Sequence, residues 1–144
     1  MKHKGAIMEY SKERMDDLMR AYDEYISSCD YIRMSEVYKI IVNMASRRFW
    51  VSDIRAALII SAMMRGKTDL STMCPLKKEM YEEIYNRVFK LQEECPELTI
   101  SELCAKVIAQ PAPKFYLTPG SAKVMVCKAR KQWIQEKWKR LRLL

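Results

Sequence analysis

The residues of this sequence that are best suited to chemistry are positively charged and lie near its C-terminal end. From Ala112 to Leu144 there are nine Lys and Arg residues but one acidic residue, Glu136. The 111 residues before this segment hold 17 basic and 17 acidic residues, so the net charge of +8 comes entirely from it. Such a concentration of positive charge is typical of a surface that binds a polyanion.

We predict that this segment binds nucleic acid, and duplex DNA in particular, mainly through phosphate groups. The predicted contact residues include one aromatic side chain that could stack on a base: Lys114, Tyr116, Lys123, Lys128, Arg130, Lys131, Lys137, Lys139 and Arg140. Arg142 is the ninth basic residue of the segment. A function as a small regulator of a bacterial or phage genome would fit. A solvated basic surface that only keeps the protein soluble is the alternative.

The same segment has the pattern of an amphipathic helix. At 100° per residue, five apolar residues fall within about a third of a turn and are expected to face a core: Ala122, Met125, Val126, Ala129 and Trp133. Four basic residues are expected on the opposite side, toward solvent: Lys123, Lys128, Arg130 and Lys131. The sequence therefore predicts a helix with a core face and a basic outer face.

Other kinds of chemistry have little support. The single histidine, His3, lies in the N-terminal tail, and no combination of Ser, His and Asp or of Cys and His suggests a nucleophile. No two of the five cysteines have the C-x2-C spacing of a zinc site: Cys29, Cys74, Cys95, Cys104 and Cys127. We therefore expect no enzymatic activity, no cofactor and no metal, and we interpret the cysteines as small, reduced, apolar residues.

The sequence predicts a cytoplasmic protein. No segment reaches the roughly 18 consecutive apolar residues that span a bilayer. The first ten residues, MKHKGAIMEY, carry positive charge but lack the apolar core of a secretory signal. The amphipathic C-terminal segment WIQEKWKRLRLL could nevertheless lie on an acidic membrane surface.

The elements that must position the basic segment are predicted by an internal repeat with an offset of 66 residues. Seven residues are identical to their counterparts 66 positions later without any gap: Lys12, Glu13, Cys29, Ser35, Glu36, Phe49 and Ala56. The other matches are conservative and fall mainly at apolar and helix-capping positions. We interpret this pattern as a tandem duplication.

Each copy is predicted to hold three helices, which gives an all-α fold of two helix-turn-helix-like, three-helix units. The helices are expected at 11–28, 35–44 and from 53 onward, and again at 76–94, 101–110 and from 119 onward. Ser35 and Ser101 are predicted to cap the second helices, and Ser52 and Thr118 the third. The expected domains are a flexible tail at 1–10, a unit at 11–66, a linker at 67–75 and a unit with a basic extension at 76–144.

The stretches RFWVSD and KFYLTP, which begin at Arg48 and Lys114, connect the second and third helices of each copy. We expect Phe49 and Phe115 to fill the cores of the units from these connections. For the neighbouring aromatic residues, Trp50 and Tyr116, burial and exposure remain equally open.

The first copy of the third helix, Ile54–Met64, is apolar almost all round, with Arg55 as its one internal charge. We therefore expect it to be mostly buried, between the units or in a homodimer or protein interface. This gives the alternative function, a non-enzymatic helical adaptor that binds a protein through this helix and the amphipathic tail.

The predicted architecture is similar in outline to homeodomain-like and Myb-like modules. The connection at 45–51 has seven residues, however, whereas a simple helix-turn-helix turn has about three or four. The tryptophan spacing of Myb-like repeats is also absent, so no family follows from the sequence.

Overall fold

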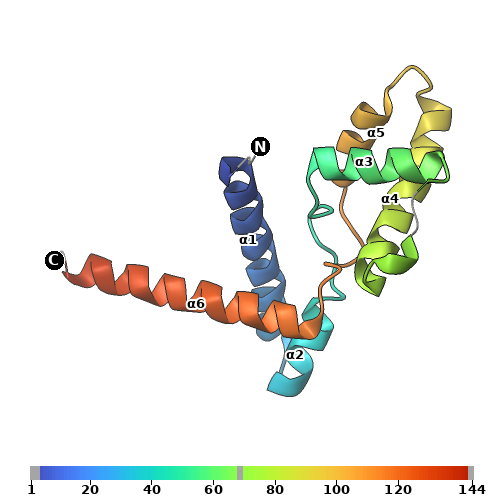
Figure 1. Cartoon of the computed structure of the whole chain (residues 1–144). Helices are drawn as coiled ribbons and strands as arrows, with labels where there is room; N and C mark the ends of the chain where they lie inside the picture. The colour runs from blue at the N-terminus through green and yellow to red at the C-terminus, as the bar shows by residue number, and fades with distance from the viewer. Residues whose placement is uncertain (1–3, 68–69, 143–144) are drawn as a thin grey trace. The chain divides into compact units, whose positions relative to one another are not determined.

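The structure is a computed structural model that describes residues 4–67 and 70–142. Along the chain these residues form α1 (Lys4–Ser28), α2 (Met34–Ile41), α3 (Asp53–Met64), the short 3-10 helix η1 (Leu70–Thr72), α4 (Pro75–Glu94), α5 (Ile100–Ile108) and α6 (Pro119–Arg142) (Figure 1). No strand occurs in the described ranges, where the only β-type pairing is one isolated bridge. The predicted all-α class is therefore confirmed.

The helices form two compact units, and each unit combines helices from both halves of the chain. Unit 1 contains the described parts of Met1–Met44 and Leu117–Leu144, so α1 and α2 pack with α6. Unit 2 is Ala45–Tyr116, in which α3 packs with α4 and α5. The compact units thus differ from the predicted division into 11–66 and 76–144, because each third helix packs with the first two helices of the other half.

The core of unit 1 is built on one face of each of its helices. Buried residues recur every three or four positions, which is the spacing of a single helix face: Leu18, Ala21 and Tyr22 in α1, Val37, Tyr38 and Ile41 in α2, and Ala122 and Val126 in α6. Asp17 is also fully buried, and both Nε and a terminal nitrogen of Arg20 donate hydrogen bonds to its carboxylate, at 2.9 and 2.7 Å. The charge-assisted bonds offset part of the cost of burying this carboxylate.

The core of unit 2 follows the same plan. Its buried side chains form one cluster that includes Phe49, Ile60 of α3, Ile84 and Val88 of α4, and Leu103, Val107 and Ile108 of α5. The guanidinium of Arg87 lies over the Phe49 ring at 4.9 Å and donates a hydrogen bond to the carbonyl of Pro111 at 2.9 Å. Phe49 and Phe115 are 0% and 4% exposed, so both connecting phenylalanines are buried as expected.

The two connecting stretches meet inside unit 2. Ser46 and Ala112, which are 66 positions apart, exchange two backbone hydrogen bonds of 3.0 Å in an antiparallel bridge. The Ser46 hydroxyl also donates a hydrogen bond of 2.7 Å to the carbonyl of Arg48, and it lies 3.3 Å from the carbonyl of Lys114. Lys114 is 66 positions after Arg48. Equivalent backbone positions of the two halves therefore pair with each other, as in a two-fold symmetric contact.

Several predicted boundaries need correction. The tail at 1–10 was expected to be flexible, but α1 begins at Lys4, and only residues 1–3 lie outside the described part. The linker at 67–75 contains η1 and the first residue of α4. Ser35 and Ser101 are not caps, since α2 and α5 begin one residue earlier and the Thr99 side chain caps α5 by accepting a hydrogen bond from the Glu102 N–H.

The prediction that α3 is mostly buried is wrong for one of its faces. Ala56 and Ile60 are fully buried, but the side chains of Ile54 and Leu58 are 66% and 62% exposed. In a three-helix unit the third helix has neighbours on one side, here α4 and α5. No described helix of the unit packs on the opposite side of α3, although the residues there are apolar. The outer face of α3 therefore remains open to solvent.

Candidate nucleic-acid interface

The beginning of α6 is fixed by its cap and its core contacts. The hydroxyl of Thr118 accepts a hydrogen bond from the Ser121 N–H at 3.1 Å, and Pro119 occupies the first helical position, where no N–H is needed. One turn further, Ala122 and Val126 are fully buried against unit 1. These contacts determine the direction in which the rest of α6 extends.

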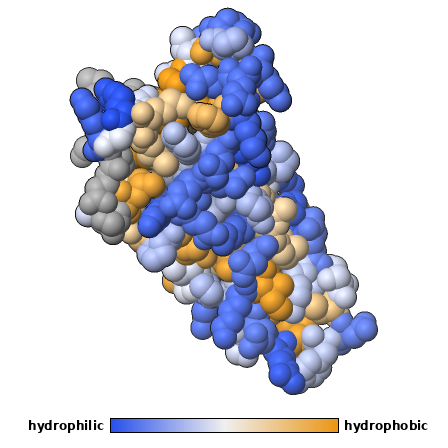
Figure 2. Space-filling view, turned by 90° about the vertical axis from the view of Figure 1, so that its right-hand side faces the viewer, coloured by the Kyte–Doolittle hydropathy of each residue, from blue (hydrophilic) through white to orange (hydrophobic). Residues whose placement is uncertain are grey.

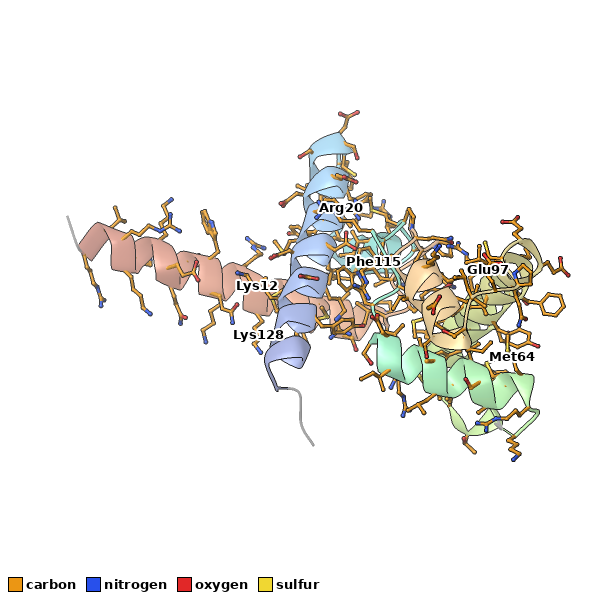
Figure 3. The ribbon with its side chains drawn as sticks, turned by 90° about the horizontal axis from the view of Figure 1, so that it is seen from above. Lys12, Arg20, Met64, Glu97, Phe115 and Lys128 are labelled. Atoms are coloured by element: carbon orange, nitrogen blue, oxygen red, sulfur yellow. The ribbon has the colours of Figure 1, made fainter. Side chains whose placement is uncertain are left out.

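Beyond this anchored part, α6 is open to solvent. From Cys127 to Arg142 every residue except the partly buried Ala129 is exposed. Within unit 1, α1 crosses α6 near the N-terminal part of α6, and the two helices then diverge (Figure 1). Figure 3 shows side chains projecting on both sides of the end of α6 that lies farthest from α1. Exposed polar side chains cover much of the face of the molecule in Figure 2, with apolar side chains between them. The distal two-thirds of α6 is therefore an accessible helical surface.

α6 carries most of the net positive charge of the chain. Eight basic residues lie in α6, and all of them are exposed: Lys123, Lys128, Arg130, Lys131, Lys137, Lys139, Arg140 and Arg142. The only acidic residue of the helix is Glu136, so the formal charge of α6 is eight minus one, or +7. Like charges at this density favour the binding of a polyanion, which would relieve their mutual repulsion.

Four of these cations follow one line along α6, which we call the outer stripe: Lys128, Lys131, Lys139 and Arg142. At 100° per residue they fall within an arc of about 80°, on the side away from the buried Ala122 and Val126. Gln135 lies in the middle of the stripe. Neither Gln135 nor Arg142 was among the predicted contact residues, although their spacing from Lys128 was visible in the sequence.

The remaining basic residues of α6 point elsewhere. The guanidinium of Arg130 lies 3.4 Å from the hydroxyl of Tyr22 on α1, so it flanks the core rather than lying opposite to it as predicted. The ammonium group of Lys137 lies over the ring of Trp133, at 5.2 Å. These side chains surround α6 with positive charge but do not extend the outer stripe.

Lys114 and Tyr116, the other two predicted contact residues, belong to unit 2 and are engaged there. The Lys114 ammonium forms an ion pair of 2.6 Å with Glu79, and the Tyr116 ring stacks on Phe49 with 6.1 Å between centroids. Burial, together with the negative charges of Glu83 and Glu79, raises the pKa of the Tyr116 hydroxyl to about 12. Tyr116 is thus half-buried and offers little of its ring for stacking on a base.

An open groove of about 1000 Å³ lies between α1 and α6 in unit 1. Its α1 side contains Lys12, Asp16 and Asp23. Its α6 side contains Glu136 beside Arg130 and Trp133, together with Gln135 and Lys139 of the outer stripe. Carboxylates on both sides disfavour a polyanion in the groove itself. Lys128, Lys131 and Arg142 do not line the groove, so this part of the outer stripe is the better surface for phosphate groups.

Neither a metal-binding cluster nor a membrane-spanning helix occurs in the described residues. Across 4–67 and 70–142 no group of three His, Cys, Asp or Glu side chains could hold a metal ion, and His3 lies outside these ranges. No helix within them is both long enough and apolar enough to cross a membrane. No family model, curated protein or solved structure matches the chain.

Proposed function

We propose that this protein binds nucleic acid, specifically duplex DNA, through the outer stripe of α6 and without catalysing a reaction. The observation that carries the proposal is the alignment of Lys128, Lys131, Lys139 and Arg142 on an exposed face that holds no carboxylate. A role as a small cytoplasmic regulator of a bacterial or phage genome remains the expected context. The five cysteines, which are unpaired, are consistent with a reducing compartment.

The dimensions of the stripe support contacts with the DNA backbone. With a rise of 1.5 Å per residue, the 14 steps from Lys128 to Arg142 span about 21 Å. One strand of a duplex presents about six phosphates over this length. An α-helix also fits the major groove, where Gln135 could donate and accept hydrogen bonds at a base edge. Since it is the one such side chain in the stripe, phosphate contacts should dominate over base reading.

The test is the salt dependence of duplex binding, measured by fluorescence anisotropy with a labelled mixed-sequence duplex. Four phosphate contacts give a slope of about −3.6 for log affinity against log salt, so affinity should fall about 100-fold between 50 and 200 mM salt. Replacing the four cations of the outer stripe with alanine should remove most of this slope. The fold should persist, because all four side chains are exposed.

A matched control separates a specific surface from overall charge. The quadruple variant Lys77→Ala, Lys78→Ala, Lys90→Ala and Lys106→Ala removes the same formal charge from exposed positions of unit 2. Its duplex affinity should stay within a few-fold of the wild-type value. Equal losses in both variants would mean that net charge alone attracts DNA, and no binding of the wild-type protein at micromolar concentration would refute the proposal.

A second candidate function, binding of a protein partner or a second copy, is favoured by the outer face of α3. The exposed side chains of Ile54 and Leu58 lie one turn apart on this face. Exposed large apolar residues that adjoin on one helix are a common feature of protein interfaces. This supports the expected role of Ile54–Met64 as an interaction surface, although not as a buried helix.

We further propose that the chain arose as a tandem duplication of a three-helix unit. Pairs of residues 66 positions apart support this, because they have matching burial: Leu18 and Ile84, Val37 and Leu103, Phe49 and Phe115, Ala56 and Ala122, and Ile60 and Val126. The proposed DNA-binding unit is helix-turn-helix-like in outline only. Its second helix, α2, packs with α6 of the other half rather than with the helix that follows it in sequence.

A further inference from the structure

α6 has a second, mainly apolar face whose side chains remain exposed, although Cys127 contacts Tyr38 of α2 and Ile134 lines the groove between α1 and α6. Residues at alternating spacings of three and four run along it: Val124, Cys127, Lys131, Ile134, Trp138 and Leu141. All six are exposed, including Val124 at 67% and Trp138 at 60%. This alternation is that of the a and d positions of a coiled-coil heptad. We call these six residues the α6 seam.

The α6 seam is distinct from the face that holds α6 in unit 1. In the same heptad register, the buried residues Ala122 and Val126 fall at positions f and c, away from a and d. The helices that pack on α6 in unit 1 are α1 and α2. The helix therefore has one apolar face that packs in unit 1 and a second one, interrupted by Lys131, whose side chains remain exposed.

The charges beside the seam determine what can cover it. In a coiled coil, the residues at e and g flank the seam, and their charges determine which partner helix can form ion pairs with them. In α6 these positions are Lys123, Lys128, Arg130, Gln135, Lys137 and Arg142, so five of the six are basic and none is acidic. Pairing with α6 of a second copy would bring like charges together along the whole contact, in either relative direction.

From this pattern we propose that the α6 seam binds an amphipathic helix of a protein partner, with apolar residues at a and d and acidic residues at e and g. Ile134, Trp138 and Leu141 would supply the buried contacts, with Trp138 as the main anchor. The five flanking cations would form ion pairs with the acidic residues of the partner. Lys131, the one polar residue of the seam, would fix the register at some cost in affinity.

This inference does not depend on DNA binding, although both use α6. Lys128 and Arg142 of the outer stripe flank the seam, and Lys131 belongs to both surfaces, so a bound acidic helix should compete with duplex DNA. The apolar residues distinguish the two ligands. A phosphate backbone makes no apolar contact with Ile134 and Trp138. A partner helix, in contrast, must bury both side chains to exclude water from its own apolar face.

The experiment uses the full chain and a labelled synthetic peptide of four heptads, with Leu at a and d and Glu at e and g. Repulsion between its own glutamates keeps this peptide from self-pairing. Fluorescence anisotropy should show that it binds the wild-type protein. A peptide with Lys at e and g, and an acidic peptide with Ser in place of Leu, should bind at least tenfold more weakly.

Two matched double variants complete the test. Ile134→Ser with Trp138→Ser removes the apolar contacts and should weaken binding of the acidic peptide at least tenfold, while duplex affinity stays within about twofold. Ile54→Ser with Leu58→Ser makes a similar change on the exposed face of α3 and should leave peptide binding unchanged. All four side chains are exposed, so both variants should keep the helical circular dichroism of the wild type.

Three results would overturn the proposal. The first is that the acidic peptide does not bind the wild-type protein. The second is that it binds the Ile134→Ser, Trp138→Ser variant as tightly as the wild type, which would mean attraction by charge alone. The third is that the seam binds vesicles of anionic phospholipid but not the peptide. Loss of duplex binding with peptide binding intact would instead count only against the DNA-binding function.

Discussion

α3 and α6 each pack against two other helices of their own unit, but they end in different ways. Each begins after a hydroxyl cap, Ser52 or Thr118, and each buries an alanine in its first turn and a branched residue one turn later. α3 then stops at Met64. The N–H groups of Gly66 and Lys67 donate to the carbonyls of Met63 and Ala62, at 3.0 and 2.9 Å, in a Schellman motif.

The counterpart of Gly66 in α6 is Gln132, and the helix continues through it for ten more residues to Arg142. The charges differ as well. α3 holds one acidic and one basic residue, Asp53 and Arg55, whereas α6 has a formal charge of +7. The shared features thus lie on the buried faces, where packing constrains them, and the differences lie on the outer faces and in the extension.

The largest predicted effect tests whether the inner and outer faces of α3 have been placed correctly. Ile60 is fully buried, so Ile60→Ala should lower the free energy of unfolding by about 2–5 kcal/mol. Leu58→Ala, two residues earlier on the exposed face, should cost less than about 0.5 kcal/mol. Urea denaturation followed by circular dichroism measures both, and similar losses would mean that α3 is covered on both sides.

A smaller effect tests why one helix ends where the other continues. Gly66 has φ of +67°, and no heavy atom lies within 4 Å of the place that a Cβ would occupy. Gly66→Ala would therefore be strained by its backbone conformation and not by crowding, and we expect a loss of about 1 kcal/mol. The reciprocal change Gln132→Gly places glycine inside the exposed part of α6 and should also cost roughly 1 kcal/mol.

Thermal unfolding of the two variants measures these losses. Gly66→Ala should affect the stability of unit 2 without changing duplex binding. Gln132→Gly should weaken duplex binding as well, because it disturbs the helix between Lys131 and Lys139. If Gly66→Ala had no effect on stability, the glycine could not be the reason that α3 ends.

The helices themselves could be predicted from sequence because their signals are local. Ser52, Thr118 and Pro119 predicted the first residues of α3 and α6 correctly, since caps and proline act through neighbouring backbone groups. The burial of Phe49 and Phe115 also followed from the repeated pattern. The cap of α5 was misplaced because Thr99 and Ser101 are both suitable, and only backbone geometry distinguishes them.

The exchange of third helices could not be predicted in the same way. The 66-residue pattern shows which segments are alike but not which helices pack together. Ala56 and Ala122 are fully buried in different units. Among the predicted contact residues, the cations of α6 are exposed, whereas the contacts of Lys114 with Glu79 and of Tyr116 with Phe49 depend on tertiary structure and could not be predicted from sequence.

The smallest predicted effect on stability compares the outer faces of the two third helices directly. Leu58 and Val124 are 66 positions apart and similarly exposed, at 62% and 67%. Replacing either with Gln should change the free energy of unfolding by no more than about 0.5 kcal/mol, because neither substitution opens a cavity or buries a polar group. Urea denaturation at two protein concentrations measures this. A loss above about 1 kcal/mol for Leu58→Gln, growing with protein concentration, would show that a second copy covers α3.

Binding of the acidic peptide should separate the same two variants, although their stabilities are alike. Val124→Gln removes an apolar contact from the α6 seam and should weaken peptide binding several-fold. Leu58→Gln should leave peptide binding unchanged, because α3 lies outside the seam. Equal peptide affinities for both variants would place the bound helix farther along α6, on Ile134, Trp138 and Leu141 alone.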